Sequence, residues 1–120
     1  MTINLSVQRK VDDYKRISIP KKVCQKLNWK KGTNLFCLQM KNDKKLYIFL
    51  NIDDFVKSNN VKIENVLILQ TRKLDILNRI VIPREIYNDL KFCSGKKINI
   101  KHIDNYVVAE NIWHYNSKEL

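Results

Sequence analysis

The chain lacks most of the features from which an active site is built. It has 120 residues but only two glycines, which excludes a glycine-rich phosphate-binding loop. Its two histidines, His102 and His114, lie apart and show no metal-ligand spacing. No candidate nucleophile has a base beside it in a known arrangement. The sequence therefore predicts no enzyme, no cofactor and no metal site.

Disulfide and membrane-spanning features are also missing. The cysteines are odd in number and have no Cys-x-x-Cys spacing, which is typical of small apolar core residues in a reducing compartment: Cys24, Cys37 and Cys93. No apolar run is long enough for a spanning helix, and no signal segment opens the chain. We expect a cytoplasmic protein without a membrane partner.

Positive charge, in contrast, is abundant. Lys and Arg number 23 against 12 Asp and Glu, which gives a net charge of +11 and an isoelectric point near 9.7. Such an excess indicates a polyanionic partner, nucleic acid first and an anionic membrane surface second. Residues 1–60 contribute +8 and residues 61–120 contribute +3. The first half is therefore the expected electrostatic anchor.

The chain also contains an internal repeat with a constant offset of 63 positions. Residues 9–20, Arg-Lys-Val-Asp-Asp-Tyr-Lys-Arg-Ile-Ser-Ile-Pro, return at 72–83 as Arg-Lys-Leu-Asp-Ile-Leu-Asn-Arg-Ile-Val-Ile-Pro. The match continues without a gap as far as Gly32 and Gly95. One structural unit is thus used twice. Because half of such a short chain would have a marginal core, we expect the two copies to share one.

Each copy predicts the same order of short elements. Apolar alternation indicates a strand, a turn follows, and a second short strand ends at Pro20 or Pro83, where a helix begins. After the glycine, two further strands form a hairpin. The expected fold is mainly β with short helices. The expected divisions are a first copy at 1–50, a linker with a short helix at 51–65, a second copy at 66–110 and a tail at 111–120.

The pattern Arg-Lys-hydrophobic-Asp, turn, Arg-Ile-x-Ile-Pro, short helix and glycine resembles the AbrB/SpoVT DNA-binding domain. That family also includes the MazE antitoxins and the two-copy MraZ proteins. The resemblance covers about residues 3–50 and 66–110. It implies a swapped-hairpin β-barrel built from both copies. The barrel could close within one chain, which the short linker favours, or between two chains, and relatives form homo-oligomers.

The resemblance also implies which residues contact DNA. In the family these are basic residues of the first strand and the turn, with added charge near the helix start. The matching positions and their basic neighbours are Arg9, Lys10, Arg16, Lys21, Lys22 and Lys26 in the first copy and Arg72, Lys73, Arg79 and Arg84 in the second. Arginine can donate two parallel hydrogen bonds to a phosphate or to the edge of guanine, whereas lysine supplies a point charge to phosphate.

The sequence departs from the family pattern at two places. Two helix arginines of AbrB-type regulators are replaced by Cys24-Gln25 and by Tyr87-Asn88. A glycine that often precedes the turn arginine is replaced by Lys15 and Asn78. Because Asn tolerates left-handed backbone better than Lys, we expect the first turn to be shaped differently.

Simpler interpretations stand beside these. Arg16 and Arg79 could form structural ion pairs with Asp12 and Asp75, four positions earlier, and the aspartates could also orient the arginines. The lysines between 21 and 31 could be a solvated helix face. Trp29, Phe92 and the tail aromatics Trp113 and Tyr115 are expected to pack against the body.

The sequence therefore predicts a nucleoid-associated transcriptional regulator that binds double-stranded promoter DNA. The alternative is an antitoxin-like or other protein-interaction module of the same fold. Antitoxins of this family have an extended, acidic C-terminal segment around the toxin, and only about ten residues follow the last expected strand here. A different protein partner stays open.

Overall fold

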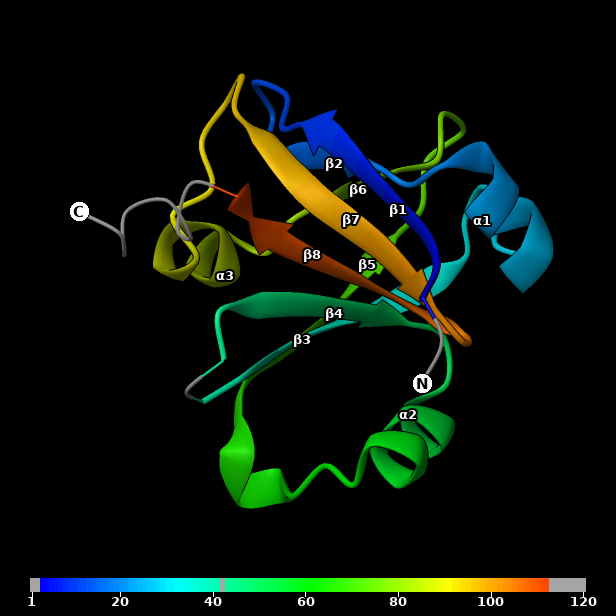
Figure 1. Ribbon diagram of the computed structural model, residues 1–120, viewed down its shortest axis with the longest axis vertical. Coiled ribbons are helices and arrows are strands. Elements are labelled where there is room, and N and C mark those ends of the chain that lie inside the picture. Colours follow the sequence, from blue (N-terminus) through cyan, green and yellow to red (C-terminus); the bar gives the residue numbers. More distant parts are fainter. Residues whose placement is uncertain (1–2, 42, 113–120) are drawn as a thin grey trace.

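The computed structural model describes residues 3–41 and 43–112 and is mainly β with short helices (Figure 1). The tail aromatics Trp113 and Tyr115, together with His114, lie outside the described residues. The elements of the first copy are β1 (Ile3–Lys10), β2 (Arg16–Ser18), α1 (Lys21–Leu27), β3 (Asn34–Met40) and β4 (Lys45–Phe49). The linker forms α2 (Ile52–Asn59) and a 3-10 turn (Ile63–Asn65). The second copy forms β5 (Val66–Lys73), β6 (Arg79–Val81), α3 (Arg84–Asp89), β7 (Lys97–Ile103) and β8 (Tyr106–Asn111).

Proline and asparagine set the limits of the helix in the first copy. Pro20 has a φ of −53° and directly precedes α1, and Pro83, also at −53°, precedes α3. A proline there ends the strand, because it has no N–H for the ladder, and its φ suits the entry to a helix. Asn28 ends α1 in the left-handed conformation, with its N–H bonded to carbonyls of the last turn.

The strands form one six-stranded antiparallel sheet in the order β1-β7-β8-β4-β3-β5 and a separate two-stranded ladder of β2 and β6. The first strand of each copy pairs with the other copy, β1 with β7 and β5 with β3. The sheet begins at β1 and ends at β5, so it is open and the expected closed barrel is not formed. The two edge strands, β1 and β5, do not pair with each other. Each is followed by a turn and then by β2 or β6, which pair in the separate ladder.

Both copies contribute to the main core. It contains Ile17, Leu35 and Ile48 from the first copy and Ile80 and Ile98 from the second. A second, aromatic cluster lies under the linker helix, where the rings of Phe49 and Phe55 stack with centroids 4.1 Å apart. The linker helix α2 is therefore packed onto the body of the protein.

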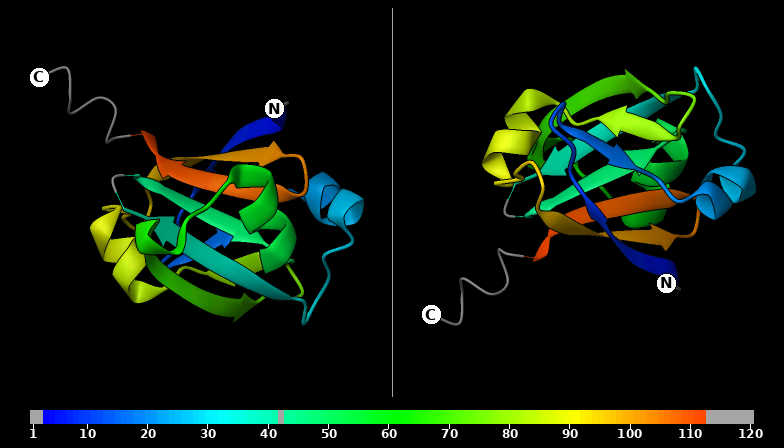
Figure 2. Two further views of the ribbon diagram at one scale, coloured as in Figure 1. Left: turned by 90° about the horizontal axis from the view of Figure 1, so that it is seen from below. Right: turned by 90° about the horizontal axis from the view of Figure 1, so that it is seen from above.

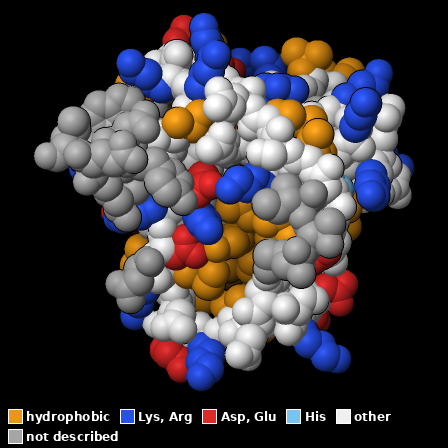
Figure 3. Space-filling model, viewed as in Figure 1, with side chains coloured by type: hydrophobic (Ala, Val, Ile, Leu, Met, Phe, Trp, Pro, Cys, Tyr) orange, Lys and Arg blue, Asp and Glu red, His pale blue; other side chains and the backbone are white. Residues whose placement is uncertain are grey.

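A hollow of about 410 Å³ lies beside this aromatic cluster. Its wall includes Tyr47, Tyr106 and Val108, and an ion pair of 2.9 Å joins Lys101 to Glu110 there. Figure 3 shows hydrophobic side chains at the base of the hollow. Its lining residues come from β3, β4, β7, β8 and the end of α2, and none of them belongs to the β2·β6 ladder. Within the described ranges, no helix is long and apolar enough to cross a membrane.

Candidate nucleic-acid interface

The β2·β6 ladder relates the two copies by a local two-fold axis. Ile17 pairs with Ile80, which is its equivalent 63 positions later. The hydrogen bonds on either side are matched as well. The N–H of Ile19 donates to the Asn78 carbonyl, and the N–H of Ile82 donates to the Lys15 carbonyl, both at 2.8 Å. The centre of the ladder is therefore a point of pseudo-symmetry at the surface (Figure 2).

The outward face of this ladder carries the two turn arginines. Side chains alternate along a strand, and Ile17 and Ile80 are buried in the core. The residues beside them therefore face outward. Arg16 lies opposite Val81, and Ser18 lies opposite Arg79.

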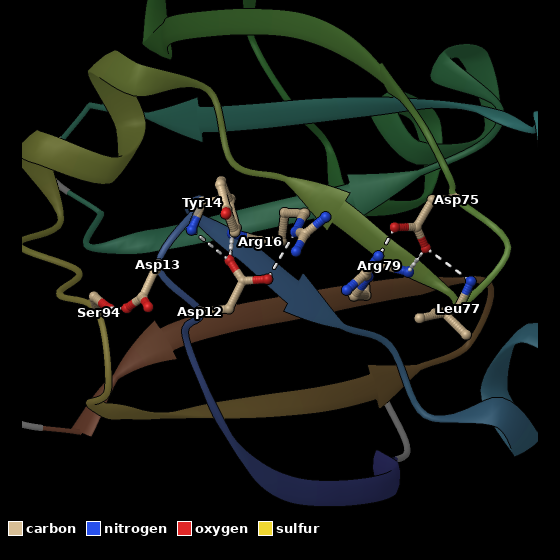
Figure 4. Close-up of polar contacts among 8 residues, drawn as sticks. All are labelled: Asp12, Asp13, Tyr14, Arg16, Asp75, Leu77, Arg79 and Ser94. Atoms are coloured by element: carbon tan, nitrogen blue, oxygen red, sulfur yellow. Dashed lines mark hydrogen bonds and ion pairs between the residues drawn. The ribbon is translucent and has the colours of Figure 1, made fainter.

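An aspartate orients each of these arginines (Figure 4). Arg16 donates from Nε to Oδ2 of Asp12 at 2.7 Å, and Arg79 donates from Nε to Oδ2 of Asp75 at 2.8 Å. The other oxygen of each aspartate accepts two backbone N–H groups, those of Tyr14 and Arg16 or of Leu77 and Arg79. The structural ion pair and the orienting role therefore coexist. The Nη atoms of both arginines make no hydrogen bond to a described residue.

The same contacts lower the pKa of both aspartates. Desolvation by burial raises the pKa of Asp12, but the backbone and side-chain hydrogen bonds from Arg16, the N–H of Tyr14 and the arginine charge outweigh it. The pKa of Asp75 is lowered by the equivalent groups of Arg79 and Leu77 against the same desolvation. Each carboxylate is thus held ionised beside its arginine.

The antiparallel ladder places each turn beside the helix of the other copy. Because Ile19 bonds to Asn78, α1 begins next to the turn 75–78. The N–H of Gly32, just after α1, donates to the Leu74 carbonyl at 2.8 Å. We call the turn 75–78, α1 and the loop 30–33 the Asp75 end. The turn 12–15, α3 and the loop 93–96 form the Asp12 end, where Gly95 donates to Val11. Figure 4 shows the helices on opposite sides.

The two ends differ in charge. At the Asp75 end every exposed charged side chain of α1 and of the loop after it is a lysine. These residues are Lys21, Lys22, Lys26, Lys30 and Lys31. At the Asp12 end both signs of charge are exposed, with the basic residues Arg84, Lys91 and Lys96 beside the acidic residues Asp13, Glu85 and Asp89. The lysines of the first copy therefore lie at the same end of the ladder as the turn of the second copy.

The remaining predicted residues lie where β1 and β5 enter their turns. Arg9 and Arg72 are half-buried, and each donates from Nη1 to the carbonyl of the preceding residue, at 3.0 and 2.8 Å. Arg72 also donates to Oε1 of Gln70 at 3.0 Å. Lys10 and Lys73 are exposed at the strand ends. These four residues flank the ladder rather than joining the arginine pair at its centre.

The first turn is not shaped differently from the second, contrary to expectation. Lys15 has a φ of 61° and Asn78 a φ of 59°. The N–H of Lys15 donates to the Asp12 carbonyl at 3.2 Å, and that of Asn78 to the Asp75 carbonyl at 3.0 Å. The ladder bond from Ile82 fixes the Lys15 carbonyl, so the main-chain hydrogen bonds impose the left-handed conformation on a lysine.

Three exposed turn residues beside the arginines were not predicted from the sequence as part of this surface: Tyr14, Ile76 and Leu77. The guanidinium carbon of Arg16 lies 4.8 Å from the centroid of the Tyr14 ring, a cation–π contact. Ile76 and Leu77 are 71% and 61% exposed at the second turn. The available signal was the difference between the copies, since Asp13 and Tyr14 occupy these positions in the first turn.

Among the residues that the structure describes, no group of three or more His, Cys, Asp or Glu side chains could hold a metal ion. Comparison of the sequence with protein-family models and with curated proteins gives no match.

Proposed function

We propose that this protein is a transcriptional regulator that binds double-stranded promoter DNA through the outward face of the β2·β6 ladder. The observation that supports this most directly is the pair Arg16 and Arg79, oriented alike on either side of a local two-fold axis. A DNA duplex has two-fold axes of its own, so both arginines can reach equivalent groups together. Their Nη atoms suit a phosphate or the edge of guanine.

We further propose that the chain is a two-copy domain of the AbrB/SpoVT type. The pairing of β1 with β7 and of β5 with β3 supports this, because strands exchanged between copies are what a swapped-hairpin arrangement requires. In this chain the pairing between the two copies is intramolecular, and the sheet is open. The ladder then presents one two-fold face per chain, and a homo-oligomer would present several.

The distribution of charge fits a duplex lying across the ladder. The net charge is +11, and exposed basic residues flank the arginine pair on both sides. Lysines at the periphery would contact phosphates and set affinity, and the two arginines beside the centre of the ladder can donate to a phosphate or to the edge of a base. We infer substantial sequence-independent affinity and action in the cytoplasm at the nucleoid.

The test is fluorescence anisotropy of labelled duplex DNA across a salt series. We expect Arg16→Ala/Arg79→Ala to weaken binding and to reduce the slope of log affinity against log salt by about one unit for each phosphate-binding side chain removed. The control is Lys57→Ala/Lys62→Ala, which removes the same charge from exposed positions in α2 and the linker.

Equal decreases in affinity for the two double variants would show that only net charge matters and would contradict an interface at the ladder. The absence of binding at low salt would reject the DNA-binding function. The protein-interaction alternative would then be examined by co-purification.

A further inference from the structure

The Asp75 end presents two adjacent apolar side chains to solvent. Ile76 is 71% exposed and Leu77 is 61% exposed. Single exposed apolar residues are common on protein surfaces, but these two form the tip of a turn next to Arg79. The exposed lysines of α1 and of the loop 30–33 lie at the same end of the ladder.

The fold of the turn does not require apolar residues at this tip. The turn is held by the Asp75 carboxylate, which accepts the N–H groups of Leu77 and Arg79, and by the main-chain bond from Asn78 to Asp75. The first turn has the same hydrogen bonds and the same left-handed residue, yet its tip is Asp13-Tyr14. The side chains of Ile76 and Leu77 are therefore free to serve recognition.

We propose that Ile76 and Leu77 pack against the 5-methyl groups of thymines in the major groove, an inference that rests on the DNA-binding function proposed above. Thymine is the base that presents an apolar group in that groove. The lysines at this end of the ladder are complementary to the phosphates on both sides of the groove, and Arg79 lies two residues further along the chain.

A turn tip of two adjacent aliphatic side chains is found at only one end of the ladder. At the Asp12 end the residue equivalent to Ile76 is Asp13, an anion that accepts a hydrogen bond from the Ser94 hydroxyl. A carboxylate cannot replace an apolar contact with a methyl group, and it is repelled by phosphate. The bound sequence is therefore asymmetric, with a thymine-rich half under the Asp75 end.

The test compares an alternating A·T duplex with the same duplex containing deoxyuridine in place of thymidine, at one salt concentration. The two differ by the 5-methyl group. The wild-type protein should bind the thymidine duplex more tightly, by about fourfold for one methyl group removed from water and about fifteenfold for two. Ile76→Ser/Leu77→Ser should bind both duplexes alike.

The matched control is Ile63→Ser, because Ile63 is 86% exposed in the linker, away from the ladder. It should keep the preference for thymidine. Equal affinity of the wild type for the two duplexes would overturn the thymine contact while leaving DNA binding intact, and a preference that survives in Ile76→Ser/Leu77→Ser would do the same. Failure to bind either duplex would overturn the proposed function and this inference together.

Discussion

The two turns of the ladder share a backbone but differ in their exposed side chains. Both have an aspartate that accepts two N–H groups and an arginine Nε, and both end in a residue with φ near 60°. Their tips, however, are Asp13-Tyr14 and Ile76-Leu77. The comparison shows which positions hold the geometry, namely the aspartate, the arginine and the buried isoleucine. The positions that point to solvent have diverged.

The two ends of the ladder also differ in which copy supplies their charge. By sequence, most of the excess charge belongs to the first copy. In space, the lysines of the first copy lie beside the turn of the second, because the antiparallel ladder crosses the copies. The Asp75 end therefore combines an apolar tip from one copy with a basic helix from the other. A comparison of copies along the chain would miss this combination.

The largest effect is expected where the two copies are most alike, at the centre of the ladder. Ile17→Ala and Ile80→Ala each remove a side chain that is 1% exposed in the shared core. Each should lower the free energy of unfolding by about 2–5 kcal/mol, and the two decreases should be similar. Urea unfolding followed by circular dichroism measures both, with the exposed Ile76→Ala as a control that should change little. Clearly unequal decreases would break the pseudo-symmetry on which the comparison rests.

A smaller effect is expected at the aspartates, and it depends on pH. Asp12→Asn and Asp75→Asn should each cost about 1–2 kcal/mol at neutral pH, because the ionised carboxylate accepts three hydrogen bonds. The folded pKa of each is lowered, so the stabilisation is complete above the unfolded pKa of about 3.9 and is lost as the pH falls through the folded value.

Urea unfolding of the wild type and both variants from neutral to acidic pH tests this dependence. The difference in the free energy of unfolding between the wild type and each variant should decrease only at acidic pH. The decrease should be similar for Asp12→Asn and Asp75→Asn. Asp13→Asn serves as the control, because this exposed neighbour has no ion pair with a described arginine. A difference that stays constant down to strongly acidic pH would show that the carboxylate charge contributes nothing to the turn.

The local features of this fold were predictable from sequence, whereas its long-range pairings were not. Alternation and the two Pro residues located the short strands and the starts of the helices, and the spacing of Asp12 and Arg16 gave the ion pair. The pairing of β1 with β7 and the open sheet depend on contacts between distant segments, which periodicity does not encode. For the same reason, the neighbours of α1 could not be assigned.

The prediction that the first turn would differ from the second was wrong for a related reason. Intrinsic backbone preference disfavours a lysine at positive φ, and sequence reasoning weighed only that preference. The main-chain bonds of Lys15 and the ladder bond from Ile82 outweigh it. The Lys15 ammonium group also lies 5.4 Å from the centroid of the Tyr87 ring, a contact with the other copy that no local pattern reveals.

The smallest expected effect distinguishes Lys15 from Asn78. The two residues have the same left-handed backbone conformation, but that conformation costs lysine more free energy than asparagine. Lysine in the left-handed region costs about 1 kcal/mol, which glycine would remove, whereas Asn tolerates that region. Against this gain, Lys15→Gly removes a cation–π interaction of about 0.5 kcal/mol, and both glycine variants gain unfolded-state entropy. In urea unfolding, Lys15→Gly should therefore be more stable than Asn78→Gly by about 0.5 kcal/mol. The opposite order would mean that the interaction between Lys15 and Tyr87 stabilises the protein by more than the backbone strain costs, so that the two turns differ in energy despite their common geometry.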